Sequence, residues 1–187
     1  MTASERYVGK GGLKLEFALE HFGVDPAGWV CADLGSQVGG FVDCLLQHGA
    51  ARVYAVDTAY GALAWKLRQD PRVVVLERTN ALHVTLPEPV RLVTADVGWT
   101  RQEVILPRAL SLLAPDGMAL SLLKTQYETD PRRIRKGRLP EEEARAVASA
   151  VIERLTVQGI GIKGWVESPL RGSRGNLEYW LLVRPGD

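Results

Sequence analysis

The regular alternation of β-type and helix-type segments is the feature that most constrains the fold of this 187-residue chain. Such alternation predicts an α/β protein with a mostly parallel sheet that helices cover on both faces. The runs expected to form strands are Trp29–Leu34, Arg52–Asp57, Arg72–Leu76, Arg91–Val97, Met118–Lys124, Ile162–Glu167 and Asn176–Val183. The segments expected to form helices are Gly12–His21, Phe41–His48, Ala59–Gln69, Gln102–Leu113 and Glu141–Leu155.

The last two strands are expected to depart from the parallel pattern. The Gly-rich segment Arg171–Gly175 that joins them is short enough for an antiparallel pair. Earlier in the chain, Pro115–Gly117 is expected to turn the backbone into the fifth strand. The sequence therefore predicts a Rossmann-like, seven-stranded sheet that is mostly parallel and carries an antiparallel C-terminal strand pair.

Length and composition predict a single domain over residues 1–187, because 46% hydrophobic residues suffice for one sizeable core. The sequence contains no apolar run near the ~18 residues that a membrane span needs. Its first residues also lack the basic-then-apolar layout of a secretion signal. We therefore expect a cytoplasmic protein without a membrane segment. The net charge of +1 does not by itself indicate a nucleic-acid partner.

The cysteines and histidines give no indication of a metal site. Cys31 and Cys44 lie in segments expected to be buried and lack ligand spacing, so we interpret them as reduced core residues. His21, His48 and His83 show no ligand spacing either. The sequence therefore predicts no bound metal.

A Gly-rich turn follows the first expected strand, in the segment Asp33–Phe41. Gly35, Gly39 and Gly40 would let the backbone turn sharply and approach a ligand closely. The spacing is not the Gly-x-Gly-x-x-Gly of dinucleotide sites, so a pyrophosphate ligand is disfavoured. The alternative is a tight strand–helix turn with no ligand.

Asp57 ends the second expected strand, at the place where an acid can accept hydrogen bonds from both hydroxyls of an adenosine ribose. Turn and acid together favour S-adenosylmethionine, a nucleoside with an amino-acid tail and no phosphate. Asn80 closes the third strand, where its amide could reach an adenine edge or could equally serve as a turn residue.

Four charged residues, far apart in sequence, should meet at one edge of such a sheet. Asp96, Lys124 and Glu178 sit at the ends of three expected strands, and Lys14 lies at the start of the first helix. Two lysines beside two carboxylates can supply a neutral amine near physiological pH, which suggests chemistry on a hydroxyl group. Each residue alone would more often form a surface ion pair. Lys124 and Glu178, however, interrupt apolar strand sequence, where a lone charge is costly unless it is paired or used.

Five basic residues gather in the segment between the fifth strand and the long helix: Arg132, Arg133, Arg135, Lys136 and Arg138. Topology places this segment near the expected catalytic edge, so contact with RNA phosphates is one interpretation. A solvated loop, balanced by the acidic run Glu141–Glu143, is the other.

Several segments resemble the hemolysin A-type (TlyA-like) proteins, which belong to the wider FtsJ-like ribose methyltransferases. They are Tyr7–Leu15, Gly39–Cys44, Arg52–Asp57, Ala64–Arg68, Glu77–Asn80, Lys124–Glu128 and Gly175–Trp180. The resemblance implies a Rossmann-like methyltransferase that moves a methyl group from S-adenosylmethionine to a ribose 2′-hydroxyl of RNA, ribosomal RNA most of all.

The resemblance also implies roles for individual residues. It makes Lys14, Asp96, Lys124 and Glu178 a catalytic tetrad. We assign Lys124 as the base, Asp96 as the group that orients it, and Lys14 as a cation that lowers the pKa of Lys124 or holds the acceptor. Glu178 would position Lys14 or the ribose, and Lys10 is an alternative cation to Lys14. The candidate cofactor-binding residues are Asp33, Gly35, Ser36, Gly39, Gly40, Phe41, Asp57, Asn80 and Asp96.

The sequence departs from the family pattern in three places. Members typically carry an N-terminal S4-type RNA-binding domain, which we do not expect within these residues. Gln37 and Val38 stand where small residues are usual, so they either crowd the methionine tail or face outward. Asp96–Trp99 and Lys124-Thr125 replace the usual Asp-Val-Ser-Phe and Lys-Pro beside the acceptor pocket. The rival hypotheses are a cofactor-binding protein without catalysis, associated with the ribosome or regulatory, and a methyltransferase for small molecules or proteins.

Overall fold

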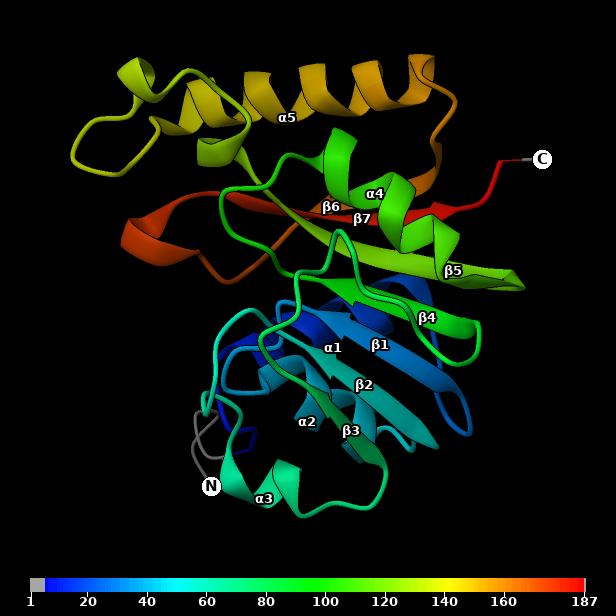
Figure 1. Cartoon of the computed structure of the whole chain (residues 1–187). Helices are drawn as coiled ribbons and strands as arrows, with labels where there is room; N and C mark the ends of the chain where they lie inside the picture. The colour runs from blue at the N-terminus through cyan, green and yellow to red at the C-terminus, as the bar shows by residue number, and fades with distance from the viewer. Residues whose placement is uncertain (1–5, 187) are drawn as a thin grey trace.

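The computed structural model describes residues 6–186 and contains one seven-stranded sheet (Figure 1). The order across the sheet is β3-β2-β1-β4-β5-β7-β6, and β7 is antiparallel to both β5 and β6. The predicted Rossmann-like arrangement with its antiparallel C-terminal pair is confirmed. The strands are β1 (Val30–Leu34), β2 (Arg52–Val56), β3 (Val73–Leu76), β4 (Val90–Ala95), β5 (Leu113–Lys124), β6 (Gly161–Glu167) and β7 (Glu178–Arg184).

Helices cover both faces of the sheet. Successive strand residues point to opposite faces, and because apolar residues occur on both faces, each face needs a covering layer. Cys31 of β1 packs in a core with α1 and α2, whereas its neighbours Ala32 and Leu34 pack in a second core with α4 and α5. Cys31 and Cys44 are buried free thiols, as expected. The helices are α1 (Gly11–Phe22), α2 (Gly40–Gln47), α3 (Trp65–Arg68), α4 (Gln102–Ser111) and α5 (Glu141–Val157).

The helix predicted over Ala59–Gln69 is wrong for most of its length, because only α3 is helical there. In the loop before α3, backbone amides donate their hydrogen bonds to side-chain carboxylates instead of to helix carbonyls. The Ala59 amide donates to Asp57 and the Gly61 amide donates to Glu77. Gly61 also has a φ of 72°, which a right-handed helix does not allow. Side-chain acceptors thus compete with the helix for the backbone donors.

The turn predicted at Pro115–Gly117 is also wrong, since these residues lie inside β5. Val90 of β4 pairs with Leu113, but Leu92 pairs with Met118, so the intervening part of β5 forms an irregular bulge. Arg91 and Asp116 form an ion pair across the bulge at 3.3 Å. A bulge of this kind bends the strand without ending it, which the turn residues alone did not indicate.

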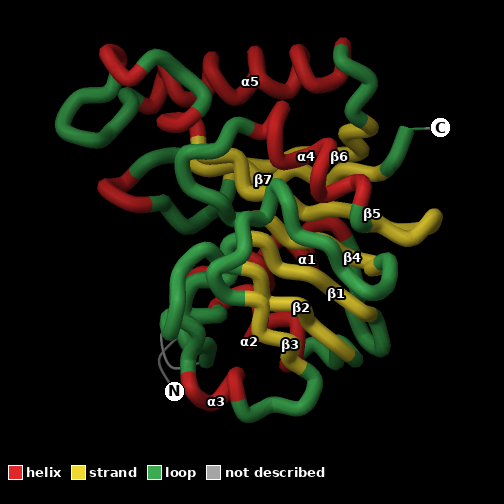
Figure 2. The backbone as a smooth tube through the Cα atoms, viewed as in Figure 1, coloured by secondary structure: helices red, strands yellow, loops and turns green. Residues whose placement is uncertain are grey.

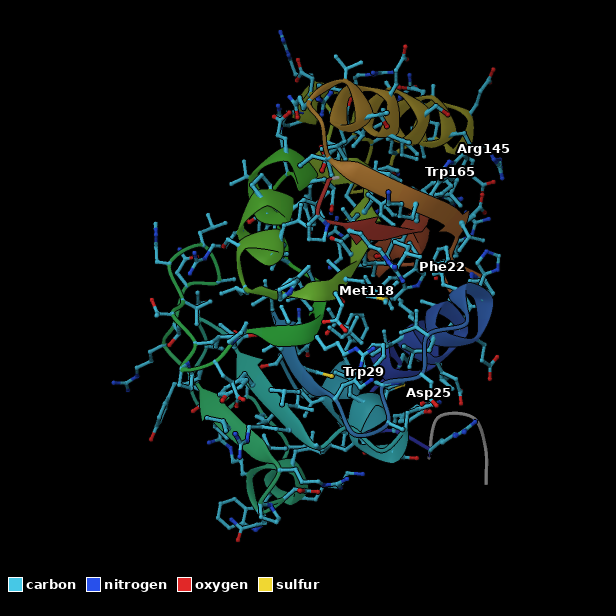
Figure 3. All side chains as sticks on the ribbon, turned by 90° about the vertical axis from the view of Figure 1, so that its right-hand side faces the viewer. Phe22, Asp25, Trp29, Met118, Arg145 and Trp165 are labelled. Atoms are coloured by element: carbon cyan, nitrogen blue, oxygen red, sulfur yellow. The ribbon has the colours of Figure 1, made fainter. Side chains whose placement is uncertain are left out.

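The two edges of the sheet carry different kinds of connection. The carboxyl ends of β1–β5 lie on the left in Figures 1 and 2, with the loops that follow them. β7 runs the other way, so its first residue, Glu178, starts at that same edge. The amino edge, on the right of Figure 1, faces the viewer in Figure 3, where Asp25, Trp29 and Met118 are labelled. The sequence-predicted site residues therefore gather at the carboxyl edge.

Residues 6–186 contain neither a helix that could span a membrane nor a cluster of possible metal ligands. None of the helices there combines the length and the hydropathy that crossing a membrane requires. Within the same residues, no cluster of three or more His, Cys, Asp and Glu side chains is arranged to hold a metal ion.

Candidate active site

Lys14, Asp96, Lys124 and Glu178 line one cavity of about 620 Å³ at the carboxyl edge. The antiparallel register of β5 and β7 sets Lys124 directly opposite Glu178. Asp96 follows the last residue of the neighbouring strand β4. Lys14 comes from the first turn of α1, which reaches the same cavity. Four residues separated along the chain are thus brought together by the sheet.

The four side chains form two ion pairs. Lys14 Nζ lies 2.5 Å from Glu178 Oε2, and Lys124 pairs with the carboxylate of Asp96. The Glu178 side chain is only 2% exposed and that of Lys14 is 13% exposed. Paired charges in so little solvent are held in a fixed geometry, which a surface ion pair is not.

Burial and neighbouring charges act in opposite directions on Lys124. Burial lowers the pKa of its ammonium, but the carboxylates of Asp96 and Glu178 raise it more, so the pKa lies above the ordinary lysine value. A net lowering, one of the two roles foreseen for Lys14, is therefore not found, because the carboxylates outweigh burial. Burial raises the pKa of Glu178, and Lys14 only partly offsets this effect.

A second cavity of about 370 Å³ adjoins the first. Asp57 and Asn80 line it, and it has no lysine or arginine among the described residues of its wall. The residues common to both cavities are Gly35, Gln37, Asp96, Gly98 and Trp99. A ligand could therefore extend from the carboxyl end of β2 to the ion pairs.

The loop after β1 has the geometry of a ligand cradle. Gly35 has a φ of 87°, and a Cβ atom there would lie 2.6 Å from the carbonyl oxygen of Asp96. Asp57 accepts the backbone amides of Gln37 and Ala59, each at 2.7 Å, and so holds this loop against β2. Gln37 and Val38 are both exposed and both line the larger cavity, so they stand at its open rim beside the expected methionine tail.

The remaining candidate cofactor residues differ in position. Ser36, Gly40 and Phe41 line the larger cavity. Gly39 lines neither cavity and packs against Leu63 and Leu67. Asn80 lines the smaller cavity, and its side-chain oxygen also accepts the Leu82 amide at 2.9 Å, so it does act as a turn residue.

Asp33 is a buried carboxylate that lines the larger cavity. Thr94 donates a hydrogen bond to it at 2.7 Å, and no described residue forms an ion pair with it. Burial raises the pKa of Asp33 to about 7, and Asp96 and Asp57 add to the effect, although the Thr94 hydrogen bond opposes it. The site thus suits a ligand with a positive charge, such as the ammonium group of an amino-acid tail.

Trp99 was expected only as a departure from the family pattern, and Tyr127 was not predicted to have a role. Trp99 is 87% exposed, and its backbone has a φ of 63°. The centroid of its ring lies 4.8 Å from the centroid of the Tyr127 ring. Both rings line the larger cavity. Tyr127 is partly buried, so Trp99 is the exposed ring of this pair, and only its place in the Asp96–Trp99 segment indicated it in the sequence.

The basic segment divides into two groups. Arg132 pairs with Asp130, Arg133 with Glu143, and Arg138 with Glu141. Arg135 and Lys136 are exposed and have no acidic partner within residues 6–186. The balancing role foreseen for the acidic run therefore applies to part of the segment only.

The chain is similar in sequence to known methyltransferases and to hemolysin A. Residues 7–184 match the FtsJ-like methyltransferase family. The 16S/23S rRNA (cytidine-2′-O)-methyltransferase TlyA of Mycobacterium tuberculosis is 41% identical, over 98% of this chain and 71% of its own length. Hemolysin A of Brachyspira hyodysenteriae is 32% identical, over 93% of this chain and 75% of its own length.

A solved structure has the same fold. The crystal structure of a candidate hemolysin from Lactococcus lactis superposes with a TM-score of 0.90 at 35% identity. The superposition covers 97% of this chain and 90% of that one. The likeness therefore extends over both cavities and both halves of the sheet.

Proposed function

This chain belongs to the FtsJ-like methyltransferase family, and from that premise we propose that it methylates a ribose 2′-hydroxyl of RNA, most of all ribosomal RNA. The observation that carries the proposal is the convergence of two lysine–carboxylate pairs on a cavity that adjoins a second, nucleoside-sized cavity. The relatives whose names describe rRNA methylation support the same acceptor. Such an acceptor would place the reaction in the cytoplasm.

The residues of the two cavities fit S-adenosylmethionine. Asp57 would accept the ribose hydroxyls, since each of its oxygens keeps a free lone pair beside the backbone amide that it accepts. Asn80 would face the adenine, and Asp33 would neutralise the ammonium group of the amino-acid tail. When bound, this cofactor supplies an electrophilic methyl group.

The ion pairs would prepare the acceptor hydroxyl for attack. Lys124 Nζ would take the proton of the 2′-hydroxyl, with Asp96 fixing the direction of the amine. Lys14, held by Glu178, would hold the oxygen in place. Because the carboxylates raise the pKa of Lys124, the neutral amine is a minority at neutral pH, and the rate should rise with pH into the alkaline range.

An aromatic pair supports RNA over a small acceptor. Nucleobases stack on exposed aromatic rings, a contact worth ~1–3 kcal/mol per base. Trp99 presents such a ring at the cavity that holds Lys124, next to the partly buried ring of Tyr127. The acceptor base would stack there while its ribose reaches the two ion pairs.

The test is methyl transfer itself. The purified protein is incubated with labelled S-adenosylmethionine and with 30S or 50S ribosomal subunits, and the labelled nucleotide is mapped. Label on a ribose 2′-oxygen is the expected result. Label on protein or on small molecules would reject the RNA acceptor. Tight cofactor binding without any transfer would favour the non-catalytic alternative.

A further inference from the structure

Two loops far apart in sequence meet beside the active site: residues 130–139, which follow β5, and residues 171–176, which precede β7. They lie side by side at the left of Figure 1. Arg174 Nη1 donates to the carbonyl oxygen of Lys136 at 3.0 Å. The buried Asn176 donates to the Gly137 carbonyl and accepts the Leu139 amide, each at 2.9 Å. The two loops thus form one surface.

The charges on this joint surface are not all neutralised. Arg132, Arg133 and Arg138 each have an acidic partner. Arg135, Lys136 and Arg174 are exposed and have none within residues 6–186. The hydrogen bond of Arg174 to a neutral carbonyl leaves its charge uncompensated. Three cations therefore remain to attract an anionic partner.

The backbone holds these cations in place at an energetic cost. Arg135 and Arg138 exchange two backbone hydrogen bonds of 2.9 Å, which closes a tight hairpin. Its two central residues, Lys136 and Gly137, have φ values of 50° and 79°, as a type I′ turn requires. Arg174 also has a positive φ, of 56°. A left-handed conformation costs a residue with a side chain ~1–2 kcal/mol, so the tertiary contacts must impose it.

The same surface continues into the active site. Arg171, Gly172 and Ser173 line the cavity that holds the two ion pairs. Gly172 packs so closely on Glu178 that a Cβ atom there would lie 1.9 Å from the carboxylate. The Arg174 loop is therefore built directly against the residue that holds Lys14. An anion bound on the surface would sit at the rim of the reaction site.

We infer that Arg135, Lys136 and Arg174 form one phosphate-binding surface for the RNA backbone beside the acceptor nucleotide. The inference rests on the proposed function for its choice of RNA. It departs from the sequence prediction in two ways, because it adds Arg174 and gives the ion-paired Arg132, Arg133 and Arg138 a minor part. Guanidinium and ammonium groups bind phosphate oxygens, and an RNA acceptor carries phosphates on either side of the ribose.

The experiment compares two triple variants that each remove three positive charges. One combines Arg135→Gln, Lys136→Gln and Arg174→Gln, and the other combines Arg132→Gln, Arg133→Gln and Arg138→Gln. Affinity for deproteinised ribosomal RNA is measured against salt concentration. Each phosphate contact contributes about 0.7–0.9 to the logarithmic salt slope. The first variant should lose roughly two to three units of slope, and the second less than one.

Binding is read separately from methyl transfer, so the inference and the proposed function can fail independently. Equal slopes in the two variants would overturn the inference even if the wild type methylates RNA. A wild type that binds a glutamate-rich polypeptide and not RNA would also overturn it. Arg174→Lys keeps the charge and should keep the slope. If it loses as much slope as Arg174→Gln, then position 174 acts through loop structure and the phosphate contact is rejected.

Discussion

The turns at the two edges of the sheet differ in whether residues other than glycine adopt left-handed backbone conformations. At the amino edge, every described residue with a positive φ is a glycine: Gly23, Gly28, Gly49 and Gly159. At the carboxyl edge, besides several glycines, a residue with a side chain adopts such a conformation in each of five loops: Gln37 after β1, Arg78 after β3, Trp99 after β4, Lys136 after β5 and Arg174 after β6.

This difference distinguishes structural turns from functional ones. Glycine takes a left-handed conformation without steric cost, whereas each side chain there costs ~1–2 kcal/mol. Strain of this kind persists where a side chain is needed at a given place, and it gathers at binding sites. Because Gln37 and Trp99 line the cavities and Lys136 and Arg174 carry the basic surface, the strained edge is also the candidate functional edge.

The largest expected effect at the carboxyl edge is on methyl transfer. Lys124→Met keeps the apolar stem but removes the titratable nitrogen, so transfer should fall by ~10²–10⁴, the usual scale for loss of a general base. Cofactor affinity, measured by calorimetry, should not change. The control is Lys163→Met, on the exposed face of β6, which should keep the wild-type rate. A Lys124→Met protein as fast as wild type would reject Lys124 as the base.

Asp57 at the carboxyl edge can be tested for cofactor binding against Asp25 at the amino edge as a matched control. Asp57 and Asp25 each accept the amide of the residue two positions on. Asp57→Ala should weaken cofactor binding by ~1–3 kcal/mol, since charged hydrogen bonds are lost. Asp25→Ala, at the amino edge seen in Figure 3, should leave cofactor affinity unchanged. Equal affinities in titrations of the two variants would remove Asp57 from the cofactor site.

The titration of Asp33 should make cofactor affinity depend on pH. Burial raises its pKa to about 7, so the free protein holds this carboxyl protonated below neutrality. A cationic ligand favours the charged form, so affinity should rise about tenfold per pH unit as pH approaches 7 and level off above it. Asp33→Asn should flatten the profile. A wild-type affinity that is constant from pH 5 to 8 would exclude this role.

The raised pKa of Asp33 should also affect the stability of the free protein. Cofactor affinity should rise with pH, whereas this contribution to the free energy of unfolding should fall. A carboxyl whose pKa is raised on folding stabilises the folded state while it is protonated in both states. That contribution is lost as pH rises from the unfolded value of about 4 through the folded value of about 7. Chemical unfolding of wild type and Asp33→Asn at several pH values would measure the difference. The dependence should be absent from the variant.

The smallest expected effects test the backbone comparison directly. Lys136→Gly should relieve a left-handed side chain and raise the free energy of unfolding by up to ~1 kcal/mol, while it weakens RNA binding. Gly28→Ala introduces a side chain at a φ of 73° with open space around it, so it should lower stability by ~1 kcal/mol without a change in RNA binding. If both variants change stability in the same direction, the proposed contrast between the edges is wrong.

Sequence patterns located the strands well but missed features that depend on tertiary contacts. Apolar runs predicted seven strands, and Glu178 was expected at the same edge of the sheet as Lys124, but the pairing of β7 with β5 was not predicted. The loop before α3 could not be predicted, because its helix is replaced by hydrogen bonds to Glu77, on another segment. The bulge in β5 depends on pairing with β4, which Pro115–Gly117 alone does not reveal.

In the candidate site too, the sequence indicated which residues meet but missed features that depend on tertiary contacts. Topology predicted that Lys14, Asp96, Lys124 and Glu178 would meet, because strand ends define one edge. The expected lowering of the Lys124 pKa was wrong, since the balance between burial and the neighbouring carboxylates depends on the distances in the folded protein. Arg174 was not identified either, because only side-chain hydrogen bonds between distant loops connect it to Lys136.

The position of β7 between β5 and β6 has a consequence for how the protein folds. Its contacts with β5 link residues far apart in sequence, and such long-range pairings form late because the intervening chain must first be ordered. β6 joins the sheet through β7 or together with it, since β7 is its only neighbour in the sheet that residues 6–186 form. Because β7 also carries Glu178, closure of the sheet and assembly of the ion pairs should be one kinetic event. Partly folded chains would then possess the cradle after β1 but no competent acceptor site.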